Sequence, residues 1–203
     1  MEKKIVVSLV GMIGAGKTTA LNQLSSMGYP VLAEDYIDAP QKIQCDNRLI
    51  LSKWAWIANW FYKITHYFKE NPDAHFVIVD RNVQEAGIWT SACHPLLNPI
   101  QLSLKELSDK YRFVNICLHC DYNTIKTRIH DRLKEEPVRN NYNESNISFL
   151  DDLYEDYQGN KDLWDHFIDT SCTDAETVCK QIVSHLSVLE LHPAIYCGAT
   201  FEE

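Results

Sequence analysis

Three closely spaced glycines, followed by a lysine and a threonine, constrain this chain more than any other feature. The run reads Gly-Met-Ile-Gly-Ala-Gly-Lys-Thr over residues 11–18 and directly follows the apolar segment 5–10. Glycines allow backbone torsions that are closed to other residues, so consecutive N–H groups can point at one phosphate chain. A helix that begins here would place the positive end of its dipole beside the same anion. The pattern predicts a strand, a phosphate-binding loop and a helix, in that order.

The side chains of this loop suit a nucleoside triphosphate with its magnesium ion. Lys17 brings a positive charge to the outer phosphates, and Thr18 offers a hydroxyl to Mg²⁺. The alternative is a glycine-rich turn that happens to precede a helix, and the completeness of the motif argues against it. The residues expected to contact the nucleotide are Gly11, Met12, Ile13, Gly14, Ala15, Gly16, Lys17, Thr18 and Thr19.

Length and composition narrow the class of protein. At 203 residues the chain can bury a substantial core, and we expect one domain over residues 1–203. The formal net charge of −9 argues against a broad surface for nucleic acid or for an acidic membrane, so neither is expected as a partner. No segment fits a membrane span or a targeting peptide. Seven cysteines without framework spacing indicate reduced thiols, so a cytoplasmic protein is predicted.

Apolar strand-like segments alternate with helical ones along the whole chain. The expected strands are 5–10, 30–33, 75–79, 113–118 and 166–169, and the main expected helices are 18–27, 41–70, 102–110, 123–136, 147–164 and 173–189. A further helix is expected to run to about residue 93, before Pro95 and Pro99 break the chain. This alternation predicts an α/β protein with a doubly wound, parallel, five-stranded sheet and helices on both faces. Cys117 and Cys120 are expected to be buried core thiols.

Charged residues follow two of the predicted strands. Asp80 ends one of them and can help to hold Mg²⁺, whereas Glu34 follows another and can take a proton from an attacking hydroxyl group. Arg81 can orient that base or clamp an acceptor. The carboxyl ends of parallel strands meet at one edge of a sheet, so these groups should lie near the phosphate loop. A solvated strand end and an ordinary ion pair are the alternatives.

Two arginines on a later helix provide further positive charge. Arg128 and Arg132 are four residues apart, so they share one helical face and can both reach a transferring phosphoryl group. Exposed basic residues on a helix often do no more than solvate it, and that alternative stays open here. If they act on the phosphoryl group, they stabilise charge on its equatorial oxygens.

The order of these motifs resembles that of the P-loop deoxynucleoside kinases, within the thymidylate kinase-like superfamily. The loop Gly-Met-Ile-Gly-Ala-Gly-Lys-Thr-Thr matches the family pattern, and Asp-Arg-Asn at 80–82 stands where the family has Glu-Arg-Ser. The segment 128–136 is similar to the family's arginine-rich lid, and 149–154 to the helix after it. The resemblance spans about residues 5–164.

The resemblance implies a P-loop kinase fold with a short lid at about 128–140 and the transfer of the ATP γ-phosphate to the 5′-hydroxyl of a deoxynucleoside. By position, Glu34 would be the base and Arg81 its partner, with Lys17 on the phosphates. Arg128 and Arg132 would be lid residues, and Glu136 would contact the sugar 3′-hydroxyl. ATP and Mg²⁺ are the implied cofactors, and a homodimer is the implied assembly.

The expected base site departs from the family pattern. Glu34 is followed by Asp35 instead of proline, so either carboxylate could be the base. Asn59 stands in place of the glutamine that reads the base, on a helix that also carries Trp56. The substrate residues expected from the resemblance are Glu34, Trp56, Asn59, Arg81, Ala86 and Glu136. Trp89 lies near the family's stacking aromatic residue but outside ungapped register.

Two other functions fit parts of the sequence. A thymidylate-type nucleoside-monophosphate kinase needs cations for the phosphate of its acceptor, and only Lys42, Arg48 and Lys53 lie between residues 34 and 59. A nucleotide-binding module without catalysis would explain the altered surroundings of Glu34 and Asn59. The complete set of phosphate and magnesium residues argues against that module.

Overall fold

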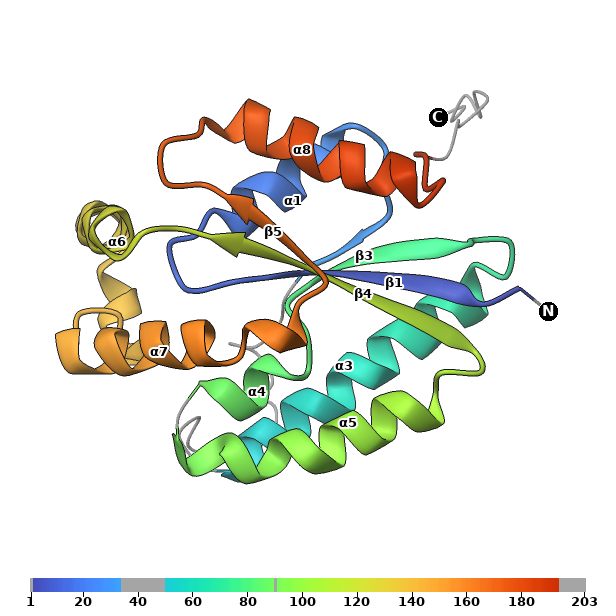
Figure 1. Ribbon diagram of the computed structural model, residues 1–203, viewed down its shortest axis with the longest axis horizontal. Coiled ribbons are helices and arrows are strands. Elements are labelled where there is room, and N and C mark those ends of the chain that lie inside the picture. The colour runs from blue at the N-terminus through green and yellow to red at the C-terminus, as the bar shows by residue number, and fades with distance from the viewer. Residues whose placement is uncertain (1, 34–49, 90, 194–203) are drawn as a thin grey trace, which may run out of the picture.

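The computed structural model describes residues 2–33, 50–89 and 91–193, arranged around one parallel sheet (Figure 1). The strands are β1 (Lys4–Val10), β2 (Val31–Leu32), β3 (Phe76–Asp80), β4 (Tyr111–His119) and β5 (His166–Asp169). Their order in the sheet is β2-β3-β1-β4-β5, and every neighbouring pair is parallel. The prediction of a five-stranded parallel sheet is confirmed.

Helices cover both faces of this sheet, as the alternation of segments predicted. The α-helices are α1 (Lys17–Ser26), α3 (Ile50–Glu70), α4 (Glu85–Ile88), α5 (Leu97–Glu106), α6 (Tyr122–Glu135), α7 (Ile147–Gly159) and α8 (Ala175–Val188). The 3₁₀ helices are η1 (Ser91–Leu96), η2 (Pro137–Tyr142) and η3 (Lys161–Leu163). Helices α1 and α8 lie over one face, and α3, α4, α5 and α7 lie along the other (Figure 1). Among the described helices, none combines the length and the apolar character that a membrane span requires.

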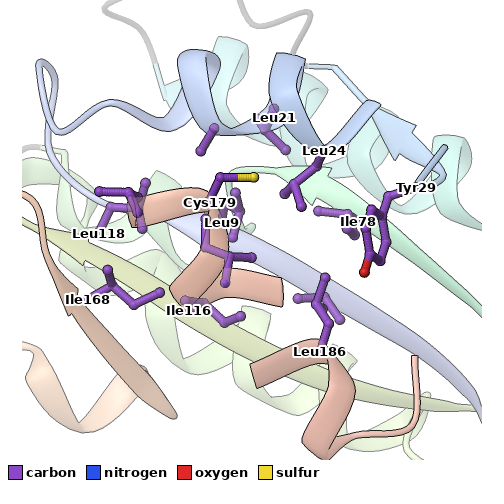
Figure 2. Close-up of a cluster of buried hydrophobic side chains, with 14 of the residues drawn as sticks. Leu9, Leu21, Leu24, Tyr29, Ile78, Ile116, Leu118, Ile168, Cys179 and Leu186 are labelled. Carbon is purple, nitrogen blue, oxygen red and sulfur yellow. The ribbon is translucent and has the colours of Figure 1, made fainter. Parts of the chain in front are cut away.

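Strand β1 is central because its side chains are apolar on both sides. Val7 and Leu9 pack into the cluster beneath α1 and α8, which Figure 2 shows. Val6 faces the opposite way, into the cluster formed with α3 and α5. Residues one apart on a strand point to opposite faces, so a continuous aliphatic run is what a doubly covered strand requires.

The chain between β3 and β4 differs from the prediction. Helix α4 ends at Ile88 and is followed by η1, and α5 already begins at Leu97, five residues earlier than expected. Pro95 lies inside η1 and Pro99 in the first turn of α5. A proline in the first helical turn removes an N–H that has no intrahelical partner, so it does not break the helix. The expectation that Pro99 ends helical structure is wrong for this reason.

The later helices begin at side-chain caps. Asp121, Asn146 and Asp174 accept hydrogen bonds from backbone N–H groups three residues on, at 3.0, 3.2 and 2.8 Å, and these bonds start α6, α7 and α8. The cysteine prediction is confirmed, because Cys117 and Cys120 are both buried. Burial raises the pKa of Cys117 to about 12, so its thiol stays protonated at neutral pH.

Candidate active site

The phosphate loop has a backbone that only glycine tolerates at two critical points. Gly11 has a φ of 142°, and a Cβ atom there would lie 2.5 Å from the backbone oxygen of Leu118 on β4. Gly16 has a φ of 95° and forms the N-cap of α1, with nothing within 4 Å of an added Cβ. Position 11 therefore requires glycine because of both its backbone torsion and the lack of room for a Cβ atom. Position 16 requires glycine because of its torsion alone.

This difference predicts unequal effects of alanine at the two glycines. Gly11→Ala is expected to lower the free energy of unfolding by about 3 kcal/mol or more, because backbone strain adds to a clash that no side chain can relieve. Gly16→Ala is expected to cost about 1–2 kcal/mol, the torsional part alone. Urea unfolding of both variants measures the difference. Equal losses at the two positions would contradict the prediction.

A cavity of about 770 Å³ opens at the carboxyl edge of the sheet, above the phosphate loop. Its walls come from the loop and α1, from the ends of β2 and β3, from α6 and η2, and from the segment around the start of α8. Residues that form its walls include Gly14, Gly16, Lys17, Thr18, Thr19, Ala33, Asp80, Arg81, Trp89, Arg128, Arg132, Glu136, Arg139, Glu144, Thr170, Thr173 and Val178. Residues distant in the sequence thus meet in one hollow.

Lys17 lies at the base of this cavity and is 7% exposed. Its ammonium group donates hydrogen bonds to the backbone oxygens of Gly11 at 2.6 Å and Met12 at 3.1 Å. These contacts hold the charge against the loop, beside the amides that would face a phosphate.

Thr18 and Asp80 could hold a magnesium ion in the same cavity. Both line it, one from the start of α1 and the other from the end of β3. Within the described ranges, no group of three or more histidine, cysteine, aspartate or glutamate side chains could hold a metal. Mg²⁺ binds through one or two protein oxygens together with phosphate and water, so a hydroxyl and a carboxylate fit it.

Arg81 follows β3 in a conformation that is unusual for arginine, with a φ of 66°. Its N–H donates to Leu9 at 3.0 Å, and its carbonyl accepts from the indole N–H of Trp60 at 3.1 Å. Its guanidinium carbon lies 4.7 Å from the centroid of the Trp89 ring, a cation–π contact. These two backbone hydrogen bonds hold the strained residue in place, and its guanidinium lies at the cavity wall beside Trp89.

Arg128, in the middle of α6, connects this helix to the phosphate loop. Its guanidinium donates to the carbonyl of Gly14 at 3.3 Å and to that of Thr170 at 2.6 Å. The hydroxyl of Thr170 in turn donates to Ala15 at 3.1 Å. The arginine thus connects the loop, α6 and the end of β5.

A second arginine of α6 is held by a buried carboxylate. Arg132 pairs with Glu144, whose side chain is 5% exposed, and Glu144 also accepts from Arg139 at 3.2 Å. Arg139 pairs with Glu136 as well. The Nε of Arg132 is buried, and it has no hydrogen-bond partner among the described atoms.

No protein-family model and no curated protein matches the sequence. Solved structures with a similar fold do match it. Thymidylate kinase from Candida albicans is 15% identical, with a TM-score of 0.62 and 93% of each chain covered. Deoxyadenosine kinase from M. mycoides with bound dATP is 16% identical, with a TM-score of 0.57 over 90% of this chain and 99% of that one. The chain has the P-loop kinase fold.

A kinase solved with a different small molecule shares the fold. Shikimate kinase from Acinetobacter baumannii, solved with shikimate, is 17% identical, with a TM-score of 0.53 over 94% of this chain and 97% of that one. At such identities the likeness shows the fold alone.

Within this P-loop kinase fold, the predicted phosphate residues from 13 to 19 and both predicted magnesium residues line one cavity, whereas Gly11, Met12 and several predicted substrate residues do not. Trp56 and Ala86 are buried in the cluster between β3, α3 and α5, and Asn59 is half-buried on α3. None of these three is among the described residues that line the cavity. Glu136 does line it. Glu34, the predicted base, lies outside the described residues, as do Asp35, Lys42 and Arg48; Ala33, just before Glu34, lines the cavity.

Two residues of this site gave no usable signal in the sequence, and a third gave a weak one. Arg139 and Glu144 lie in and after η2, where no helical periodicity relates them to Arg132. Glu85 is four residues after Arg81, a spacing that could have suggested the ion pair between them, at 3.6 Å.

Proposed function

We propose that the chain is a deoxynucleoside kinase that transfers the ATP γ-phosphate to the 5′-hydroxyl of a nucleoside. The observation that carries this proposal is one cavity whose walls include the phosphate loop, Arg128 and Arg132 together with Arg81 and Trp89. Donor phosphates and an aromatic acceptor can therefore share one cavity, as phosphoryl transfer requires.

The donor side follows from the loop. Loop amides and Lys17 would hold the triphosphate, with Thr18 and Asp80 as magnesium ligands. Mg²⁺, when bound, neutralises charge that develops on the phosphate oxygens. Arg132 lines the cavity, and its guanidinium suits an equatorial oxygen of the transferring group. Arg128, which is bound to two backbone carbonyls, would chiefly hold α6 in place beside the loop.

The acceptor side is built around Trp89 and Arg81. The Trp89 ring is half-buried and could stack on a nucleobase, while Arg81 could orient the acceptor or its base. Glu34 would accept the proton of the 5′-hydroxyl, and Glu136 would bind the sugar 3′-hydroxyl. The lining position of Ala33 supports an acceptor site at this point of the wall.

A thymidylate-type monophosphate kinase is the second candidate, favoured by one observation. Lys53 is buried with its ammonium 5.2 Å from the Trp89 centroid, so Trp89 has two cations beside it. An acceptor phosphate could use them. Against this, Arg132 and Arg139 are already paired with Glu144, which leaves less uncompensated positive charge for a second phosphate. The arrangement of Lys17, Thr18, Asp80 and Arg81 around one cavity argues against a silent nucleotide-binding module.

One substrate panel tests the proposal. With Mg-ATP, the four common deoxynucleosides are expected to yield 5′-monophosphates, whereas the matching monophosphates and shikimate are expected to be poor acceptors. Chromatographic product analysis measures both. Conversion of monophosphates with nucleosides untouched would replace the proposal with the second candidate, and ATP binding without any transfer would favour the silent module.

A further inference from the structure

Glu85 is a fully buried carboxylate that the proposed mechanism does not use. It begins α4 and has no solvent exposure. Its Oε1 accepts a hydrogen bond from the N–H of Gly11 at 3.2 Å, and its Oε2 accepts one from the N–H of Asn82 at 3.2 Å. The hydroxyl of Tyr157 on α7 also donates to it, and the guanidinium of Arg81 lies 3.6 Å away. The phosphate loop, the segment 81–85 and α7, which are distant from one another in the sequence, therefore meet at one side chain.

Glu85, Arg81 and Tyr157 form a buried cluster whose members interact through charge. The side chain of Arg81 is only 11% exposed, so its cation and the Glu85 carboxylate compensate each other in a poorly hydrated place. Burial, and then the adjacent carboxylate, raise the pKa of Tyr157 well above its ordinary value, which keeps its hydroxyl protonated as a donor. Removal of the carboxylate charge would leave the Arg81 cation without this partner.

The contacts of Glu85 connect the phosphate loop with Arg81. Gly11 is the first residue of the phosphate loop, and Arg81 reaches the Trp89 side of the wall. We infer that Glu85 is a positioning residue, which sets the place of Arg81 relative to the phosphate loop and thereby the distance between donor phosphate and acceptor. This inference rests on the proposed function for the role of Arg81. Phosphoryl transfer is sensitive to such placement, because an error of about 1 Å can cost about 10²-fold in rate.

A double-mutant cycle on kcat tests the inference. Glu85→Gln keeps the shape of the side chain and removes its charge, and it is expected to lower kcat about tenfold or more with the KM for ATP changed less than about twofold. In an Arg81→Ala background the same substitution is expected to change kcat less than about twofold, since Glu85 acts through Arg81. Equal effects of Glu85→Gln in the two backgrounds would overturn the inference, because a merely structural residue acts independently of Arg81.

Tyr157→Phe provides the matched control for stability. It removes one hydrogen bond from the same buried cluster and leaves the charge pair intact, so kcat is expected to fall clearly less than in Glu85→Gln at a similar melting temperature. An equal fall in kcat would overturn the inference. Should Glu85→Gln alone fail to fold, the comparison of Arg81→Ala with Arg81→Ala/Glu85→Gln decides: equal kcat supports the inference, and a further tenfold fall overturns it.

The acceptor in these assays is whichever panel compound the unaltered protein phosphorylates. Failure of every nucleoside as acceptor therefore counts against the proposed function alone. Additive effects of the two substitutions count against the role of Glu85 alone.

Discussion

Replacement of Lys17 by alanine is expected to lower kcat by about 10²–10³-fold, the usual effect of removing one group that stabilises charge in a transition state. Lys17 is 7% exposed at the base of the cavity, and its ammonium already lies against the loop carbonyls of Gly11 and Met12. The loss should appear in kcat for the best acceptor, measured with saturating Mg-ATP. The fold should survive, because β1 and α1 keep their apolar contacts.

The matched control is Lys180→Ala on α8. Lys180 is exposed and pairs only at the surface with Glu176, at 2.6 Å among the described contacts, so its removal should leave kcat within about twofold. Circular dichroism of both variants separates loss of catalysis from loss of structure. A Lys17→Ala protein with kcat near that of the unaltered protein would contradict the assignment of the phosphate loop.

Glu34→Gln is expected to lower kcat by about 10²-fold or more while it spares ATP affinity. A general base acts on the transferring proton in the transition state, and its removal typically costs 10²–10⁴-fold. ATP should still bind, because the groups expected to hold its phosphates lie on the loop and not at residue 34. The measurements are kcat by product formation and ATP affinity by calorimetry.

Asp35→Asn is the matched control for that assignment. It removes the same charge one residue along the chain, and we expect a much smaller effect on kcat. If Asp35→Asn were the damaging change and Glu34→Gln nearly neutral, the base would be Asp35. If both were neutral, neither carboxylate would act as the base.

The sequence by itself determined the phosphate loop, the five strands and the presence of helices on both faces of the sheet. These features follow from local patterns: glycines where the backbone needs positive φ, and mostly apolar runs at 5–10 and 113–118 where strands are buried on both faces. The position of Asp80 at the end of β3 and of Lys17 at the start of α1 needed no more than the order of the elements.

Only the tertiary structure decided which side chains contact one another around the cavity. The contact between Gly11 and Glu85 spans 74 positions, and that between Glu85 and Tyr157 spans 72. The pairing of Arg132 with Glu144 crosses from α6 to the segment after η2. No local pattern marks such partners, because burial and charge compensation depend on which elements pack together. The sequence therefore specifies the residues of the phosphate loop, whereas the packing of α4, α6 and α7 against the loop determines which charges meet across the cavity.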